Sequence, residues 1–215
     1  MMAEAHFKVY YWPGFSGRAE PILMLLTDAG VSFELVQGRE AVQAGLAAAG
    51  DVFAVPLLVE EGSGLALSQT PTILEYLGNR FGFGVKPAEH AAAKASQVGL
   101  DIADLWAEAY SSRKGADQGA AFLEARLNRW LAVLEKGAAA RGGAPFLFPG
   151  DAPSYLDYQW LNLHRCLAFL YGAAYSLAAC PHLQASADAL LARPRVISYL
   201  ASAVPVLYPS IAATN

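Results

Sequence analysis

The spacing of apolar residues changes about 80 residues into the chain, and this change restricts the possible folds more than any other feature. Up to that point short β-branched and aliphatic runs alternate with helical stripes, whereas after the segment "FGFGVKP" (81–87) only helical spacing remains. Short apolar runs predict strands, and stripes that repeat every three or four residues predict helices. The sequence therefore predicts a small α/β domain (5–82), a linker (83–89) and an all-helical domain (90–215).

In the first part, the segment "GRAEPILMLLTDAG" carries an aliphatic stripe that Gly30 ends, and residues 39–49 are Ala-rich, so both segments predict helices. The stretch "EEGSG" (60–64) predicts a hairpin turn, which makes the two strands beside it antiparallel. A further helix is predicted for "TPTILEYLGNRFG". The resulting order is β-α-β-α-β-β-α, with strands expected at 7–12, 31–36, 55–60 and 65–67.

The second part is interrupted at "RGGAP", "PGDAP", "CP" and "RP", where glycine or proline ends each helical stretch. Ser154 and Asp157 have the three-residue spacing of a capping box, which marks a helix start rather than a catalytic pair. Helices are predicted over 90–112, 117–139, 154–171 and 183–201.

Composition excludes several classes of protein. Hydrophobic residues make up 55% of the chain and charged residues 16%, so the chain has enough apolar material for a core and is not disordered. The net charge is −4 without a Lys or Arg cluster, so we expect no nucleic-acid partner. The uncharged run 166–187 contains Pro181 and His182, which shorten its apolar part below the ~20 residues that a bilayer needs. We therefore expect a buried helix there and no membrane span.

Cysteine and histidine usage argues against metal and redox chemistry. Cys166 and Cys180 are the only cysteines, and their spacing fits neither CxxC nor a zinc site. The four histidines are dispersed, so no metal is expected. Nucleotide-binding and serine-hydrolase motifs are also lacking. The first residues, "MMAEAHF", lack the features of a targeting signal, so the expected location is the cytoplasm.

Thr70 and Pro71 form a helix-start pattern, because threonine caps free N–H groups and proline is tolerated in the first turn. A helix N-terminus carries about half a positive charge, so the segment that begins at Gln69 either caps the helix only or also holds a ligand carboxylate. Val55 and Pro56 open a strand at a position where the missing proline N–H faces outward.

Five segments together resemble the cytosolic glutathione S-transferases of the tyrosine-type classes (alpha, mu, pi and sigma), although as an atypical member. They are "YYWPGFSGRAEPILMLLTDAGVSFE", "VPLLVE", "LSQTPTILEYLGNRFG", "FPGDAPSYLDY" and "RPRVISYLAS". The matches run from about residue 7 to 202 in the family's order. The resemblance implies a thioredoxin-like N-terminal domain, an all-α C-terminal domain, a homodimer and conjugation of glutathione to a hydrophobic electrophile in detoxification.

The resemblance also implies roles for particular residues. Tyr11 matches the tyrosine that hydrogen-bonds the glutathione thiolate, and Arg18 the arginine that lies near it. Val55 and a cis Pro56 match the pair that holds the cysteinyl backbone, and Gln69 and Thr70 the pair that receives the γ-glutamyl carboxylate. Asp101, Asp104 and Glu108 share one face of a predicted helix at three- and four-residue spacing. Asp104 matches the acid that some classes lend to the neighbouring subunit's glutathione, and a solvated helix face is the alternative for this acidic stripe.

The chain departs from the family pattern in the loop after the first strand. The loop between Tyr11 and Gly17 is one residue longer than usual and contains Ser16, an alternative thiolate stabiliser in the manner of the serine-type classes. Tyr10 lies on the opposite strand face. The region 37–50 lacks the tryptophan and lysine that often hold the glycyl carboxylate, which leaves Arg39 or a glutamine for that role. Cysteine is missing from the loop, which disfavours thiol–disulfide exchange.

The electrophile pocket is expected to be aromatic, so a hydrophobic acceptor is favoured. The sequence leaves two other functions open: a glutathione-dependent isomerase, and a noncatalytic binding or assembly module with the same fold. The residues expected to line the pocket are Trp12, Pro13, Phe15, Trp106, Tyr110 and Tyr208.

Overall fold

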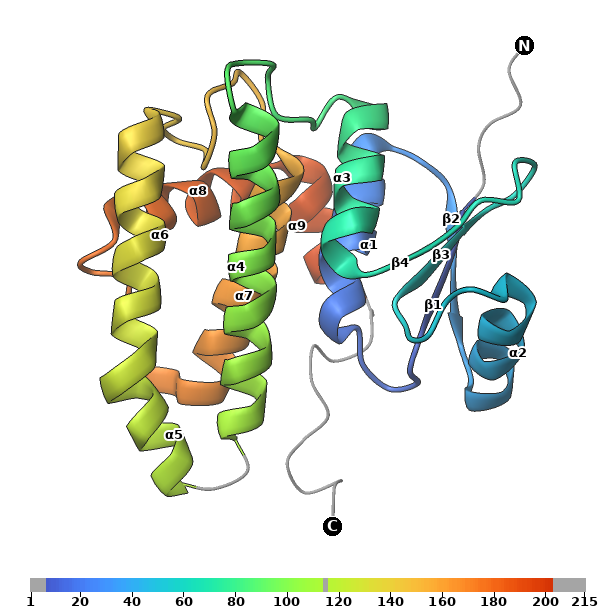
Figure 1. The fold of residues 1–215 in the computed structure, drawn as a ribbon, viewed down its shortest axis with the longest axis horizontal. Coiled ribbons are helices and arrows are strands. Elements are labelled where there is room, and N and C mark those ends of the chain that lie inside the picture. The colour runs from blue at the N-terminus through green and yellow to red at the C-terminus, as the bar shows by residue number, and fades with distance from the viewer. Residues whose placement is uncertain (1–6, 114–115, 203–215) are drawn as a thin grey trace. The chain divides into compact units, whose positions relative to one another are not determined.

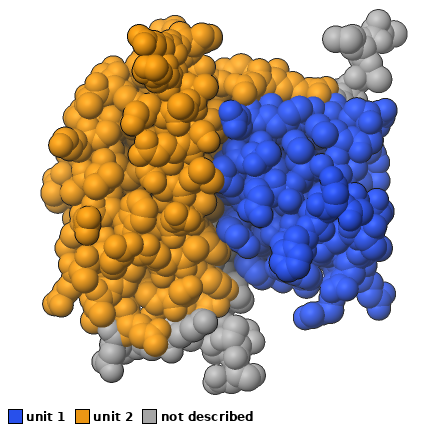
Figure 2. All heavy atoms as spheres, viewed as in Figure 1, with its two compact units in different colours: residues 1–77, 193–215 blue, residues 78–192 orange. Residues whose placement is uncertain are grey.

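The computed structural model describes residues 7–113 and 116–202 (Figure 1). The chain forms two compact units: residues 1–77 with 193–215 make up unit 1, and residues 78–192 make up unit 2 (Figure 2). A small mixed sheet belongs to the N-terminal region, and the C-terminal region is mostly helical, which confirms the predicted fold class. The division at 5–82, 83–89 and 90–215 stays a prediction.

The sheet of unit 1 has the strand order β2-β1-β3-β4 (Figure 1). Strand β2 runs parallel to β1, which requires the helical crossover between them, whereas β3 is antiparallel to β1 and β4 is antiparallel to β3. The hairpin predicted at 60–64 is therefore confirmed. The strands are β1 (Phe7–Tyr11), β2 (Phe33–Gln37), β3 (Leu57–Glu60) and β4 (Ala66–Ser68).

The helices of unit 1 follow the predicted order: α1 (Glu20–Ala29), α2 (Arg39–Ala49) and α3 (Thr70–Phe81), the last of which continues into unit 2. Most side chains of α1 are buried. It ends at Gly30, whose φ of 72° is the left-handed value that favours glycine at a helix end. Helix α9 (Pro194–Ala201) packs on α1, and Arg193 donates to the buried carboxylate of Asp28.

Unit 2 is a helical bundle in which α7 (Tyr155–Tyr171) is the most buried helix. It packs against α4 (Ala91–Ser112) and α8 (Pro181–Leu191). The helix predicted over 117–139 is divided by a π-helical turn at Leu123–Leu127. The parts on either side are α5 (Ala116–Phe122) and α6 (Asn128–Arg141).

The capping box at the start of α7 is confirmed. The Asp157 carboxylate accepts a hydrogen bond from the Ser154 main-chain N–H at 2.8 Å, and it also accepts from the Ser186 hydroxyl and the Leu147 N–H. Asp157 is fully buried, and burial raises its pKa while these donors act in the opposite direction. Its role is to hold the loop before α7 and the helix α8 in place.

The interpretation of the uncharged run 166–187 as buried helix holds only for the two ends of the run, as the break predicted at Cys180 and Pro181 implies. Helix α7 ends at Tyr171, a 3-10 turn covers Gly172–Ala174, and α8 begins only at Pro181. Phe169 is 48% exposed, so the middle of the run is not a continuous buried surface. Within the described part of the chain, none of the helices combines the length and the apolar character needed to cross a bilayer.

Candidate functional site

Tyr11 is the last residue of β1, where burial alternates along the strand. Phe7, Val9 and Tyr11 face the interior, and only 3% of the Tyr11 surface is exposed. Tyr10 points to the opposite face, where its ring lies against Gly45 of α2. A Cβ at Gly45 would lie 2.6 Å from the Tyr10 ring, so the two elements meet only because that residue is glycine.

The main chain of Arg18 connects Tyr11 to the start of α3. The Arg18 N–H donates to the Tyr11 phenol oxygen at 3.0 Å, and the Arg18 carbonyl accepts from the Thr70 hydroxyl at 3.0 Å. The phenol thus satisfies one of the amides that a helix start leaves without a helical partner. Thr70 is 52 residues from Arg18 in the chain, yet it forms one hydrogen-bonded group with Arg18 and Tyr11.

This group brings two helix beginnings together. Arg18 lies in the 3-10 turn Gly17–Ala19, which runs directly into α1, and Thr70 is the first residue of α3. Each helix start carries a partial positive charge of about half an elementary charge. A carboxylate or thiolate bound here therefore meets a favourable field from both helices.

Gly17 allows the Tyr11 ring to lie against the turn. Its φ of 44° is in the left-handed region, and a Cβ at this position would lie 2.6 Å from the Tyr11 hydroxyl oxygen and 2.9 Å from a ring carbon. Phe15 packs on the same ring edge to face, with centroids 5.4 Å apart. The phenol is therefore held between the glycine backbone and the phenylalanine ring.

Ser16, the alternative thiolate stabiliser, is fully buried. Its hydroxyl oxygen has no hydrogen-bond partner among the described residues. Its main-chain carbonyl accepts from the Ala19 N–H at 2.8 Å and so opens the turn.

The start of α3 differs from the expected threonine cap. The helix begins at Thr70 itself, whose hydroxyl is used on the Arg18 carbonyl, and the Gln69 carbonyl accepts the helical bond from the Ile73 N–H. Gln69 is exposed and has a φ of 70°, which costs a non-glycine residue about 1–3 kcal/mol. Such backbone conformations concentrate at binding sites, which favours the ligand-binding interpretation of this segment.

The Val55–Pro56 peptide bond is cis, as the resemblance implied. Val55 is buried and lies two residues before β3, which begins at Leu57 rather than at residue 55. The neighbouring Phe53 is 97% exposed.

Gln37 is a residue of the site region that the sequence did not single out. It ends β2, opposite Tyr11 in the strand register, and its side-chain amide donates to the carbonyls of Trp12 and Phe15 at 2.9 and 3.0 Å. Both bonds of the Gln37 amide nitrogen go to loop carbonyls. No local sequence pattern identifies such a contact, because it joins the end of a strand to a loop that lies 22 to 25 residues earlier in the chain. The prediction that Arg39 or a glutamine in the region 37–50 holds the glycyl carboxylate stays a prediction.

Comparison with known proteins decides the family. Residues 101–203 match the family described as Glutathione S-transferase, C-terminal domain. Over 204 residues the chain is 30% identical to glutathione S-transferase P 1 of Xenopus laevis, covering 89% of this chain and 90% of the frog protein. The chain belongs to the glutathione S-transferase family.

Solved structures share the family's fold. The pi-class glutathione S-transferase of Onchocerca volvulus has a TM-score of 0.76 at 21% identity, over 90% of this chain and 91% of that chain. Prostaglandin synthase D of Nilaparvata lugens has a TM-score of 0.73 at 17% identity, over 91% and 96% of the two chains. Proteins of the family use glutathione as co-substrate.

The acidic stripe of Asp101, Asp104 and Glu108 lies on α4. The stripe divides in the structure: Glu108 forms two hydrogen bonds with Arg126, and Asp101 accepts from Gln97. The Arg126 guanidinium lowers the pKa of the Glu108 carboxyl. Asp104 is exposed, and Arg39 lies exposed at the start of α2. The roles of Asp104 and Arg39 stay predictions.

The residues predicted for the electrophile pocket belong to both units. Trp12 and Phe15 are half-buried and Pro13 is exposed in the loop after β1. In α4, Trp106 and Tyr110 stack with centroids 4.9 Å apart, and the Arg113 guanidinium lies 3.7 Å above the Tyr110 ring. Tyr208 lies outside the described residues. The pocket itself therefore stays a prediction.

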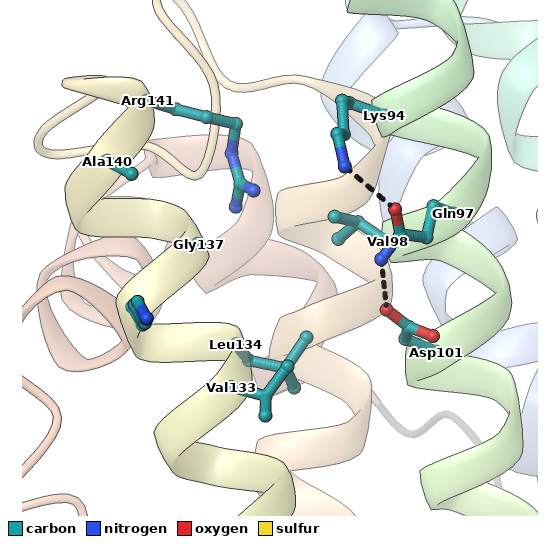
Figure 3. Close-up of a pocket in the computed structure, with 10 residues that line it drawn as sticks. Lys94, Gln97, Val98, Asp101, Val133, Leu134, Gly137, Ala140 and Arg141 are labelled. Atoms are coloured by element: carbon teal, nitrogen blue, oxygen red, sulfur yellow. Dashed lines mark hydrogen bonds between the residues drawn. The ribbon is translucent and has the colours of Figure 1, made fainter.

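Unit 2 has a pocket of about 510 Å³ between α4 and α6 (Figure 3). Lys94 donates to Gln97, and Gln97 donates to Asp101, along its α4 side, whereas Val133, Leu134 and Arg141 are among its α6 residues (Figure 3). None of the residues predicted to bind glutathione lines this pocket. Over residues 7–113 and 116–202, no group of three or more His, Cys, Asp or Glu is placed to hold a metal ion.

Proposed function

We propose that this protein is a glutathione transferase that conjugates the glutathione thiolate to a hydrophobic electrophile, with Tyr11 as the thiolate stabiliser. The observation that carries the proposal is the hydrogen-bonded group of Tyr11, Arg18 and Thr70, which brings a phenol to two helix beginnings. Val55 holds the cysteinyl backbone, and Gln69 and Thr70 receive the γ-glutamyl carboxylate in this proposal. The Arg18 guanidinium reinforces the charge of the thiolate.

The chemistry requires the thiol to be ionised. A thiol with a pKa of about 8.5 is only about 3% thiolate at pH 7, whereas lowering that pKa by about two units gives roughly 75% thiolate, a change worth about 2.7 kcal/mol. A hydroxyl has one proton to donate and also accepts, so the bond that Tyr11 accepts from the Arg18 N–H does not use its proton. An accepted hydrogen bond polarises the hydroxyl and strengthens it as a donor.

The transfer then consists of one substitution. The thiol proton leaves to water, the thiolate sulfur attacks the electrophilic carbon, and a carbon–sulfur bond forms as the leaving group departs with its electron pair. With a chloronitrobenzene the leaving group is chloride. Tyr11 remains protonated throughout and only loses a hydrogen bond to sulfur as the charge is consumed.

A glutathione-dependent isomerase is the second candidate, because it uses the same thiolate and because one solved structure of similar fold is a prostaglandin synthase. A noncatalytic binding module is the third. It is disfavoured because such modules often lose the phenol or the Gln69–Thr70 pair, and both are present in this chain.

Glutathione-affinity capture of the wild-type protein, followed by thiol titration of the complex, tests the proposal. We expect retention on the resin, a bound-thiol pKa near 6.5 and conjugation of a chloronitrobenzene. Binding without conjugation but with isomerisation of an endoperoxide would support the isomerase. A protein that neither binds nor conjugates would be a binding module.

A homodimer in the cytoplasm forms part of the same proposal. Phe53 supports it, because an aromatic side chain that is 97% exposed gains free energy when a partner covers it. Burying a phenylalanine contributes about 1.5–3 kcal/mol, and a two-fold interface contains the residue twice.

We expect Phe53→Ser to raise the dimer dissociation constant by roughly 10²- to 10⁴-fold, measured by sedimentation equilibrium. Ile197→Ser is the matched control, since Ile197 is an apolar residue of the same unit that is 51% exposed. Equal dissociation constants for the wild type and Phe53→Ser would remove Phe53 from the interface.

A further inference from the structure

The loop after β1 contains a turn in which two main-chain carbonyls accept hydrogen bonds from one side chain, that of Gln37. Pro13 and Gly14 are the central residues of the turn, and Gly14 has a φ of 87°, as a left-handed second turn position requires. The residues on either side, Trp12 and Phe15, both direct their carbonyl oxygens to the Gln37 side-chain nitrogen.

The chemistry of Gln37 suits this position better than that of other residues. Its NH₂ group has two N–H donors, and both partners are acceptors, so the amide nitrogen and not the oxygen must face the turn. Gln37 is the register partner of Tyr11 in the parallel β1–β2 pair. Its amide therefore ties the loop to the strand that lies beside the phenol.

The tied loop also supports the phenol directly. Phe15, one end of the turn, packs on the Tyr11 ring at 75° between the ring planes. Two residues later, Gly17 brings the main chain against the same ring, and the Arg18 N–H donates to its hydroxyl. A movement of residues 12–15 would displace Phe15 and the turn that follows.

We propose that Gln37 is a positioning residue, which fixes the loop at residues 12–15 and thereby holds the Tyr11 hydroxyl where it can stabilise a bound thiolate. The effect of Gln37 on the bound thiolate rests on the proposed function. The fixing of the loop by Gln37 does not, because it concerns the protein without substrate, and a separate experiment tests each of the two effects. We call the contact of the Gln37 amide with the Trp12 and Phe15 carbonyls the clamp.

Two substitutions distinguish the loss of the hydrogen-bond donor from the effect of an added charge. Gln37→Met has a similar length and no donor, and it leaves two carbonyls without the amide. Gln37→Glu has nearly the same shape but presents a carboxylate to two carbonyl oxygens, so it repels the turn. Gln118→Glu is the matched charge control, because Gln118 is exposed in α5 of unit 2.

The first measurement is amide hydrogen exchange by NMR in the protein without glutathione. We expect the Arg18 amide to exchange at least tenfold faster in Gln37→Met and Gln37→Glu than in the wild type, while amides of β1 and the melting temperature change little. Unchanged Arg18 exchange in both variants would show that Gln37 does not hold the loop, whatever the protein's activity.

The second measurement is the pKa of glutathione bound to each variant, with kcat and KM. We expect both Gln37 variants to raise the bound-thiol pKa by about one unit, equivalent to a tenfold smaller ionisation constant, and to lower kcat three- to tenfold with KM within about twofold. An effect in Gln37→Glu alone would indicate charge, and would overturn the clamp. A wild type that binds no glutathione would refute the proposed function but leave the exchange result decisive for the clamp.

Discussion

Replacing Tyr11 with phenylalanine is expected to lower the rate of conjugation to a chloronitrobenzene at least tenfold, while glutathione affinity stays nearly intact. The substitution removes only the hydroxyl, so the ring still packs against Phe15. Without the hydrogen bond to sulfur, the bound-thiol pKa rises by about two units, and the pH dependence of kcat/KM moves upward with it. Stopped-flow absorbance of the thiolate across pH measures this change.

Two controls make this result specific to the phenol. Tyr10→Phe removes a hydroxyl from the adjacent residue on the other strand face, beside α2, and should leave the rate and the thiol pKa unchanged. Ser16→Ala tests the alternative stabiliser, whose buried hydroxyl is without a described partner. If Ser16→Ala causes the loss and Tyr11→Phe does not, the serine-type mechanism replaces the one proposed.

Replacing Gly17 with alanine is expected to cause the second large effect, on stability and activity together. The added Cβ would lie 2.6 Å from the Tyr11 hydroxyl oxygen, 2.9 Å from its ring and 3.1 Å from the Phe15 ring. The Tyr11 ring is buried and has little room to move, so we expect about 2–4 kcal/mol of destabilisation from crowding and backbone strain. The displaced phenol should lower conjugation by at least tenfold. Urea unfolding and steady-state kinetics measure the two effects.

Gly142→Ala is the matched control for the backbone part of this effect. Gly142 follows α6 with a φ of 67° and a ψ of 28°, which is the left-handed conformation, and no atom lies within 4 Å of the position that a Cβ would take. It should lose only about 1 kcal/mol, the cost of a left-handed alanine. Equal losses in Gly17→Ala and Gly142→Ala would mean that Tyr11 adapts to the added methyl group at no cost.

Most of the fold was predictable because its causes are local. Gly30 ends α1 with a left-handed residue, the Ser154–Asp157 spacing starts α7, and proline opens α8 and α9. Pro181 was recognised as a helix break in the uncharged run 166–187, but hydropathy did not show that most residues between Tyr171 and Pro181 are exposed.

The sequence predicted the residues of the candidate site but not the hydrogen bonds between them. The motif around Tyr11 and the Gln69–Thr70 pair predicted which side chains belong to the site. The use of the Thr70 hydroxyl on the Arg18 carbonyl, rather than as a cap, follows from the meeting of α1 and α3. Glu108 was one of three similar acids in the sequence, and only the structure commits it to Arg126.

The amino-acid sequence by itself determined the order of strands and helices, the places where helices begin and end, and the family, because each depends on residue types at short spacing. The tertiary structure alone decided that the Arg18 main chain joins Tyr11 to Thr70 and that Gln37 holds the loop after β1. These contacts join segments 7 to 52 residues apart in the chain. Such contacts cannot be read from residue types at short spacing, because the packed sheet and helices supply the positions of donor and acceptor.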